Sequence, residues 1–167
     1  MFRWMLALAA VTAPPVAHAQ DYPGWPQKDF GTWHVYRSIT GCWIVNDNLP
    51  NDFSGRLSLS TSAEKSDLYI DLEAFDWAWQ GEGSPTLAVR FGAVSLSDEV
   101  LDIESEGTDY SVLFDAPADS YLGALRQAPN LHLEIAAGRA IDVPLTSSHE
   151  AFAYFEQCTL KLRSEKK

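Results

Sequence analysis

The chain has 167 residues, of which 46% are hydrophobic and 21% charged. This length and composition suit one domain with a sizeable core and exclude wholesale disorder. Acidic residues outnumber Lys and Arg by 23 to 12, which gives a formal net charge of −11. Such a surface repels phosphate backbones and anionic lipids, so we expect no nucleic-acid partner and no binding to a membrane surface.

Residues 1–19 have the pattern of a signal peptide. Arg3 precedes an apolar run from Trp4 to Val11, and Ala17-His18-Ala19 places small residues at the end of the segment. The run is too short to span a bilayer, which argues against the alternative of a membrane anchor. We therefore expect cleavage after Ala19, no stable membrane insertion afterwards, and a periplasmic or secreted protein.

Residues 20–30 are rich in Pro, Gly and aromatic residues and lack periodicity. They predict an extended lead-in that pins Tyr22, Trp25 or Phe30 onto the body. From Gly31 onward, apolar and polar residues alternate in short segments bounded by turn residues, which is typical of strands. Strands are expected at Trp33–Tyr36, Cys42–Val45, Leu57–Leu59, Leu68–Ala74, Leu87–Phe91, Leu101–Ile103 and Tyr110–Phe114.

Two later segments have helical spacing. Ala118, Tyr121 and Leu125 fall on one helical face, with Pro117 suited to the first turn. Ser147 and Glu150 have the spacing of a capping box that opens a second helix. A hairpin over residues 131–145 should separate the helices. Residues 31–167 are therefore interpreted as a single, mainly β (α+β) domain: an antiparallel β-sandwich or curled sheet with two short helices near the C-terminus.

The cysteines Cys42 and Cys158 are the two in the chain. In an oxidising compartment an isolated pair is usually a disulfide, and their wide separation argues against a redox-active pair. Cys42 alternates with Ile44, and Cys158 shares a helix face with Phe155, so both sulfurs should point inward. We predict a structural disulfide that attaches the C-terminal helix to an early strand.

Two candidate binding surfaces follow from the strand pattern. Phe75, Trp77 and Trp79 alternate on one face after a change of phase near Ala74, and they could form an exposed platform that stacks sugar rings or docks a protein. The alternative is that these rings fill the core. Asp71 and Glu73 share one strand face, as do Asp102 and Glu104, and together they form a candidate acidic patch. This patch could be a weak Ca²⁺ site, a glycosidase-like acid pair or a plain solvated surface.

The sequence contains few signals of catalysis. The chain has no G-x-S-x-G motif, and no two histidines have metal-ligand spacing. His34 and His132 alternate with core residues and should face solvent, whereas His149 suits the first turn of the last helix. We therefore expect no catalytic residue, no metal and no cofactor.

The order of landmarks resembles a known group of exported proteins. These landmarks are Gly31-Thr32-Trp33 opening a strand, Cys42 close behind, Asp76-Trp77, and Leu145-Thr146-Ser147-Ser148 leading into an alanine-aromatic helix with Cys158. The set is similar to small proteobacterial proteins near the invasion-associated locus B family. The resemblance implies export and a β-rich periplasmic domain with a terminal helix, and it supplies no catalytic residue.

The sequence favours a non-enzymatic periplasmic or secreted binding domain whose ligand is a protein or a glycan of the cell envelope. A secreted inhibitor or chaperone-like partner protein is one alternative. The other is a cell-envelope hydrolase that uses surface carboxylates such as Asp71, Glu73 or Asp102, although alternation places these side chains outward, where a carboxyl is not kept protonated by burial.

Overall fold

The computed structural model describes residues 27–50, 53–62, 67–74, 85–99, 109–117, 119–135 and 139–165. Within these ranges, ten strands form two antiparallel sheets. The strands of the six-stranded sheet, in spatial order, are β1 (Lys28–Phe30), β2 (Trp33–Arg37), β3 (Gly41–Asn46), β4 (Gly55–Ser62), β5 (Asp67–Ala74) and β8 (Asp109–Pro117). The four-stranded sheet has the order β10 (Arg139–Pro144), β9 (Asn130–Ile135), β6 (Thr86–Phe91) and β7 (Val94–Glu99).

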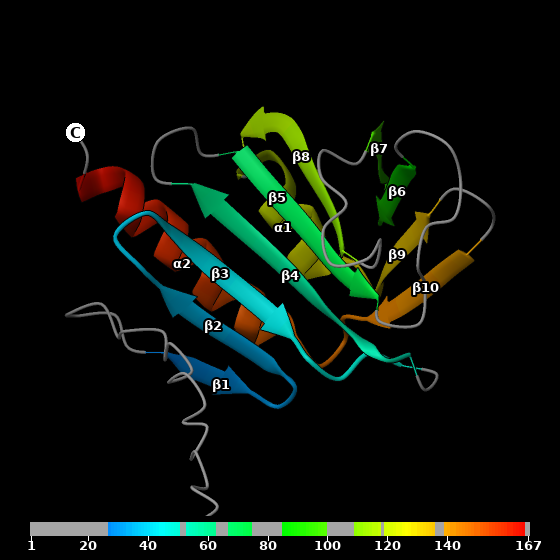
Figure 1. Cartoon of the computed structure of the whole chain (residues 1–167). Helices are drawn as coiled ribbons and strands as arrows, with labels where there is room; N and C mark the ends of the chain where they lie inside the picture. The colour runs from blue at the N-terminus through cyan, green and yellow to red at the C-terminus, as the bar shows by residue number, and fades with distance from the viewer. Residues whose placement is uncertain are drawn as a thin grey trace, which may run out of the picture.

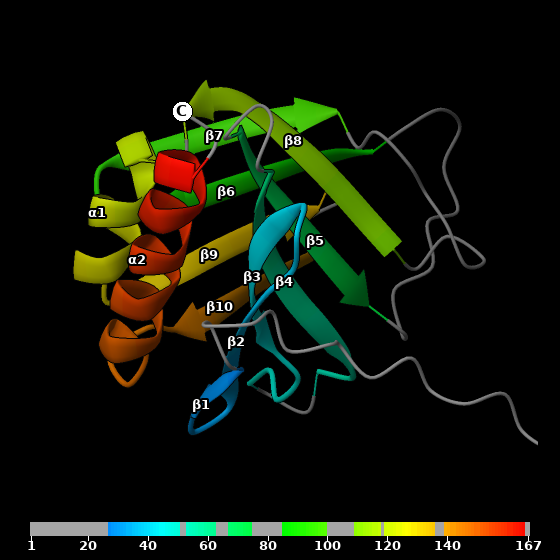
Figure 2. The same ribbon diagram turned by 90° about the vertical axis from the view of Figure 1, so that its left-hand side faces the viewer.

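Two helices lie side by side on one side of the six-stranded sheet (Figure 2). They are α1 (Asp119–Gln127) and α2 (His149–Glu165), and Arg126 of α1 donates to Glu156 of α2 over 2.8 Å. In Figure 1, α2 passes behind β2 and β3, so the viewer looks onto the opposite face of that sheet, called the uncovered face because neither helix lies on it. The predicted fold class is confirmed: the molecule is mainly β, its two sheets are antiparallel, and its helices come late in the chain.

Alternation along the strands builds the core. Val35, Ile44, Leu59 and Ile70 are direct neighbours across four strands, and each side chain is fully buried. The buried residues of the four-stranded sheet and of both helices belong to the same cluster. One contiguous core therefore fixes which face of β2 to β5 points inward and which points to solvent.

Several expected boundaries differ from the structure. The last three residues of the lead-in form edge strand β1, and Phe30 packs against Tyr154 with ring centroids 5.7 Å apart. Strand β7 was not expected. Pro117 ends β8 instead of opening a helix. The expected capping box at Ser147 is wrong. Helix α2 begins at His149, one residue later than that box requires, and the buried Ser148 donates its hydroxyl to the Leu145 carbonyl over 2.7 Å.

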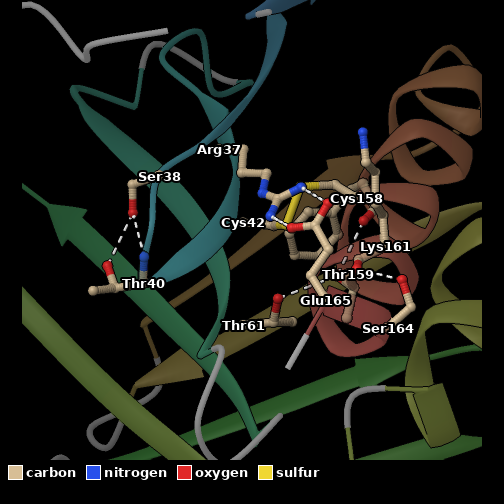
Figure 3. The surroundings of a disulfide bond; sticks show 11 residues. Arg37, Ser38, Thr40, Cys42, Thr61, Cys158, Thr159, Lys161, Ser164 and Glu165 are labelled. Atoms are coloured by element: carbon tan, nitrogen blue, oxygen red, sulfur yellow. Dashed lines mark hydrogen bonds and ion pairs between the residues drawn. A yellow bond between two sulfur atoms is a disulfide. The ribbon is translucent and has the colours of Figure 1, made fainter. Parts of the chain in front are cut away.

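Three of the contacts between helix α2 and the sheet lie at different points along the helix. Near its start, Phe152 packs against Trp33 with ring centroids 5.2 Å apart. The predicted disulfide is confirmed: Cys42 and Cys158 are bonded, with Cα atoms 6.1 Å apart and both residues fully buried. At its end, Glu165 pairs with Arg37, whose side chain is almost fully buried (Figure 3).

Two polar contacts accompany the disulfide. The buried hydroxyls of Thr61 and Thr159 lie 3.1 Å apart, so they join β4 to the same helix (Figure 3). The hydrogen bonds from Arg37 are the main cause that lowers the pKa of Glu165 below its ordinary value. Because the ionised carboxylate is the form that Arg37 binds, this contact contributes to stability at neutral pH and is lost as the pH falls through the lowered pKa.

Gly41 is required where β3 begins. A Cβ atom at this position would lie 2.4 Å from the Thr61 carbonyl oxygen and 3.1 Å from the indole ring of Trp43. We expect Gly41→Ala to lower the free energy of unfolding by about 1–3 kcal/mol, because either the strand pairing or the indole must shift. Urea denaturation measures this change.

Gly123 is the matched control for Gly41. It lies inside α1, and a Cβ atom there would meet no atom within 4 Å. Gly123→Ala should raise the free energy of unfolding by roughly 0.5–1 kcal/mol, because Ala loses less backbone entropy in a helix. If Gly41→Ala were as stable as the wild type, the close approach of β3 and β4 at this point would be contradicted.

Candidate functional site

The uncovered face of the six-stranded sheet carries a groove. On this face, Val45 on β3 lies between His34 on β2 and Ser58 on β4 in the strand register. The groove has a volume of about 430 Å³ and is lined by Gln27, His34, Tyr36, Trp43, Val45, Asp47, Arg56 and Ser58. Its size falls within the roughly 300–1,000 Å³ range of small-molecule sites.

One wall of the groove is a pair of aromatic rings. Tyr36 and Trp43 are direct cross-strand neighbours, and their rings are parallel to within 2° with centroids 5.6 Å apart. The six-membered ring of Trp43 also lies over Gly41. Both ring residues are half-buried. Cross-strand packing and the missing side chain at position 41 therefore hold this wall in place.

The phenol of Tyr36 lies among charged groups. Burial is the main cause that raises its pKa; the charge of Arg56 acts in the opposite direction, and the charges of Asp47 and Asp71 add to the rise. Tyr36 therefore keeps its proton at neutral pH. Its hydroxyl is thus a neutral donor and acceptor, beside a ring that offers an apolar surface.

The remaining walls are polar. His34 Nδ1 lies 2.7 Å from Asp29 Oδ1, and this hydrogen bond, followed by one from Gln27 Nε2, lowers the pKa of Asp29. Asp47 follows β3 and is exposed. Arg56 on β4 pairs with Glu73 on β5 at 2.9 Å. The polar groups that face the groove thus come from neighbouring strands and include both donors and acceptors.

Half of the expected acidic patch borders this groove. Asp71 and Glu73 lie on the uncovered face of β5, where Asp71 accepts a hydrogen bond from the Ser58 hydroxyl at 3.1 Å and Glu73 contacts Arg56. The strand next to β5 on the far side is β8. Asp102 and Glu104 lie outside the described residues. The contacts described here for Asp71 and Glu73 are thus cross-strand contacts with β4.

The expected aromatic platform of Phe75, Trp77 and Trp79 also lies outside the described residues, because the description of β5 ends at Ala74. The aromatic wall that the structure does describe is built from Tyr36 and Trp43. That wall lies nearer the start of the chain than the platform expected from the sequence.

The lining residues do not bring a serine hydroxyl next to a histidine base. Ser58 lines the groove, and its hydroxyl donates to Asp71. Val45 separates it from His34 in the register, and two strand spacings amount to about 10 Å. His34 therefore cannot take the proton of Ser58 directly.

The other two histidines that the structure describes do not add a site. His132 lies on the outward face of β9, with Nδ1 2.8 Å from Asp142 Oδ1, and His149 is exposed at the start of α2. Within the described ranges, no three His, Cys, Asp or Glu side chains come together in a way that could hold a metal ion. In the same part of the chain, neither helix is long and apolar enough to cross a membrane.

The sequence does contain a signal for the aromatic wall. If Val35, Cys42 and Ile44 point inward, then His34, Tyr36 and Trp43 must point outward together, and large rings on a solvent face are informative. The contributions of Arg56 and Ser58 could not be found this way, because they depend on the register between β3 and β4. Comparisons with family models, curated proteins and solved structures give no match to this chain.

Proposed function

We propose that this protein is a non-enzymatic binding domain that acts in the periplasm or outside the cell and holds its ligand in the groove of the six-stranded sheet. The observation that carries the proposal is the groove itself, with its stacked Tyr36–Trp43 wall facing polar groups on neighbouring strands. A few convergent polar groups around an apolar surface are the usual composition of a ligand site.

The surroundings of the groove favour a preformed site. Strands β2, β3 and β4 are each paired on both sides, and their inward faces belong to the core. The disulfide attaches β3 to α2 directly behind the groove. A rigid site loses little conformational entropy when a ligand binds, which favours affinity.

Export is supported by two independent features. The buried disulfide is of the kind that persists in oxidising compartments. The pattern of residues 1–19 supports a leader that is cleaved after Ala19. The ligand of this binding domain is therefore sought in the cell envelope.

Co-sedimentation with isolated Gram-negative cell envelopes tests the proposed function. The protein lacking residues 1–19 should sediment with the envelopes, and the double variant Tyr36→Ala/Asp47→Ala should bind about tenfold or more weakly, since each contact contributes of the order of 1 kcal/mol. Both changes remove groove contacts, and neither position belongs to the inward face of the sheet.

A second hollow supplies the control. It has a volume of about 360 Å³ and lies between β1 and α2, where Glu150 and Tyr154 are among its lining residues. The variant Glu150→Ala/Tyr154→Ala also removes one carboxylate and one phenol. It should bind envelopes as the wild type does. Equal binding by the groove variant and the wild type would show that the groove is not the site.

A further inference from the structure

The groove separates an apolar surface from a polar rim, and this separation indicates the chemistry of its ligand. We propose that the ligand is a glycan of uncharged pyranose units, an inference that rests on the proposed function. A pyranose ring has faces of C–H groups and a rim of hydroxyls. The parallel rings of Tyr36 and Trp43 can pack against a C–H face, as flat aromatic surfaces do with other apolar groups.

The polar rim suits hydroxyl groups. His34, Asp47 and Arg56 line the groove together with Gln27 at its β1 side. The carboxylate, guanidinium and amide groups among them carry two polar atoms in one plane, which suits contact with two neighbouring hydroxyls of a sugar, and His34 adds Nε2 beside the Nδ1 atom that contacts Asp29. Donors and acceptors are both present, and a hydroxyl can satisfy either. The rim therefore matches a ligand that is polar at its edges and carries no charge of its own.

A peptide fits this groove less well. Recognition by strand addition needs an open sheet edge, whereas β2, β3 and β4 have strands on both sides. Protein hot spots also insert large side chains into well-packed pockets from which water is excluded. This hollow is an open groove on one face of the sheet, and Val45 is the single aliphatic side chain among its described lining residues. The groove therefore offers neither a free strand edge nor an enclosed apolar pocket to a protein partner.

The charges around the groove select against anionic sugars. Asp47 lines it, and Asp29, Asp71 and Glu73 contact the lining residues His34, Ser58 and Arg56. Four carboxylates thus lie in or beside the groove. Among its described lining residues, Arg56 is the single arginine, and the whole chain has a net charge of −11. Uronic acids and phosphate-bearing polymers would be repelled. An uncharged glycan avoids this repulsion.

Two treatments of the co-sedimentation assay test the inference. Digesting the envelopes with protease before the assay should leave binding intact, because the ligand is not a protein. Adding a neutral tetrasaccharide, either cellotetraose or the tetramer of N-acetylglucosamine, should release the bound protein. Tetragalacturonate, which has the same ring size and four carboxylates, should release at least tenfold less at equal concentration.

Direct titration tests whether the groove is where the sugar binds. By calorimetry with the neutral tetrasaccharide that competes better, Asp47→Ala should raise the Kd by about tenfold, which corresponds to the loss of one good hydrogen bond. The control Glu150→Ala should leave the Kd unchanged. Thermal unfolding of both variants checks that each is folded.

The outcomes distinguish this inference from the proposed function. If protease abolishes binding while Tyr36→Ala/Asp47→Ala still weakens it on untreated envelopes, the groove binds a protein and the glycan inference is wrong. The inference is also overturned if tetragalacturonate competes better than the neutral sugars, or if neither neutral tetrasaccharide competes. If the groove variant binds untreated envelopes as the wild type does, the proposed function fails as well.

Discussion

Removing the Cys42–Cys158 disulfide should lower the free energy of unfolding by up to about 4–5 kcal/mol. The bond closes a loop with a sequence separation of 116, and cross-links across long loops restrict the unfolded chain most in the chain-entropy model. A domain of this kind has a total stability of roughly 5–15 kcal/mol. Reduction should therefore shift the urea midpoint strongly and could unfold the protein at physiological temperature.

Two preparations separate the cross-link from the packing of the sulfurs. The reduced wild type keeps both buried sulfur atoms, whereas the double variant Cys42→Ala/Cys158→Ala also leaves a small cavity in the core. Both should lose most of the stabilisation, and the double variant should lose slightly more. If reduction leaves the urea midpoint unchanged, the disulfide contributes nothing to stability.

The stability lost on removing the disulfide should be uneven along α2. Without the disulfide, the first turns of the helix remain attached through Phe152, which packs against Trp33 as part of a run of buried rings, while the last turns lose the covalent link and keep non-covalent contacts such as those of Thr159, Leu162 and Glu165. Amide hydrogen exchange should therefore accelerate first in residues 158–165.

Mass spectrometry of the unreduced, exported protein checks two premises of this prediction. The intact mass should correspond to a chain that begins at Gln20. If two thiols can be alkylated after denaturation, the disulfide is contradicted.

The features that could be predicted from the sequence are those that a local pattern determines. Leu68, Ile70 and Leu72 alternate with polar residues, and all three are fully buried on one face of β5. The disulfide followed from two inward positions in a chain with two cysteines, and the structure contains it. In each case a single segment shows which side chains must avoid water, so no knowledge of distant neighbours is needed.

The features that were missed depend on neighbours far along the chain. Strand β7 has only Val94 and Leu96 as apolar positions, both half-buried, and it forms an edge that is recognised through its pairing with β6. β5 pairs with β8, and β6 pairs with β9, across long stretches of sequence. Alternation identifies a strand and its inward face, but it does not identify the partner.

In the candidate site too, some features follow from a single strand and others depend on how strands pair. The outward direction of Tyr36 and Trp43 follows from alternation within each strand, yet their stacking depends on the pairing of position 36 with position 43. Ser58 enters the groove because it pairs with Val45. A binding surface on a sheet is a set of cross-strand neighbours, so it becomes visible only when the register is known.

Replacing Phe152 with Ala should lower the free energy of unfolding by about 3–5 kcal/mol, the usual cost of deleting a fully buried aromatic side chain. Phe152 is 1% exposed and packs against Trp33, which is also 1% exposed, at an interplanar angle of 59°. Truncation removes this ring contact and leaves a cavity between α2 and β2. Phe152→Leu should cost less, because leucine refills part of that volume.

Tyr154 is the matched control in the same helix. Its ring is half-buried at the edge of the core, near Phe30 and Lys28, so Tyr154→Ala should cost clearly less than Phe152→Ala. Urea denaturation compares the variants at constant disulfide state. Hydrogen exchange should show that Phe152→Ala loosens residues 149–155 while the disulfide still holds position 158, which is the reverse of the order expected on reduction. Equal losses for the two variants, or the same exchange order in both experiments, would contradict attachment of α2 at separate points.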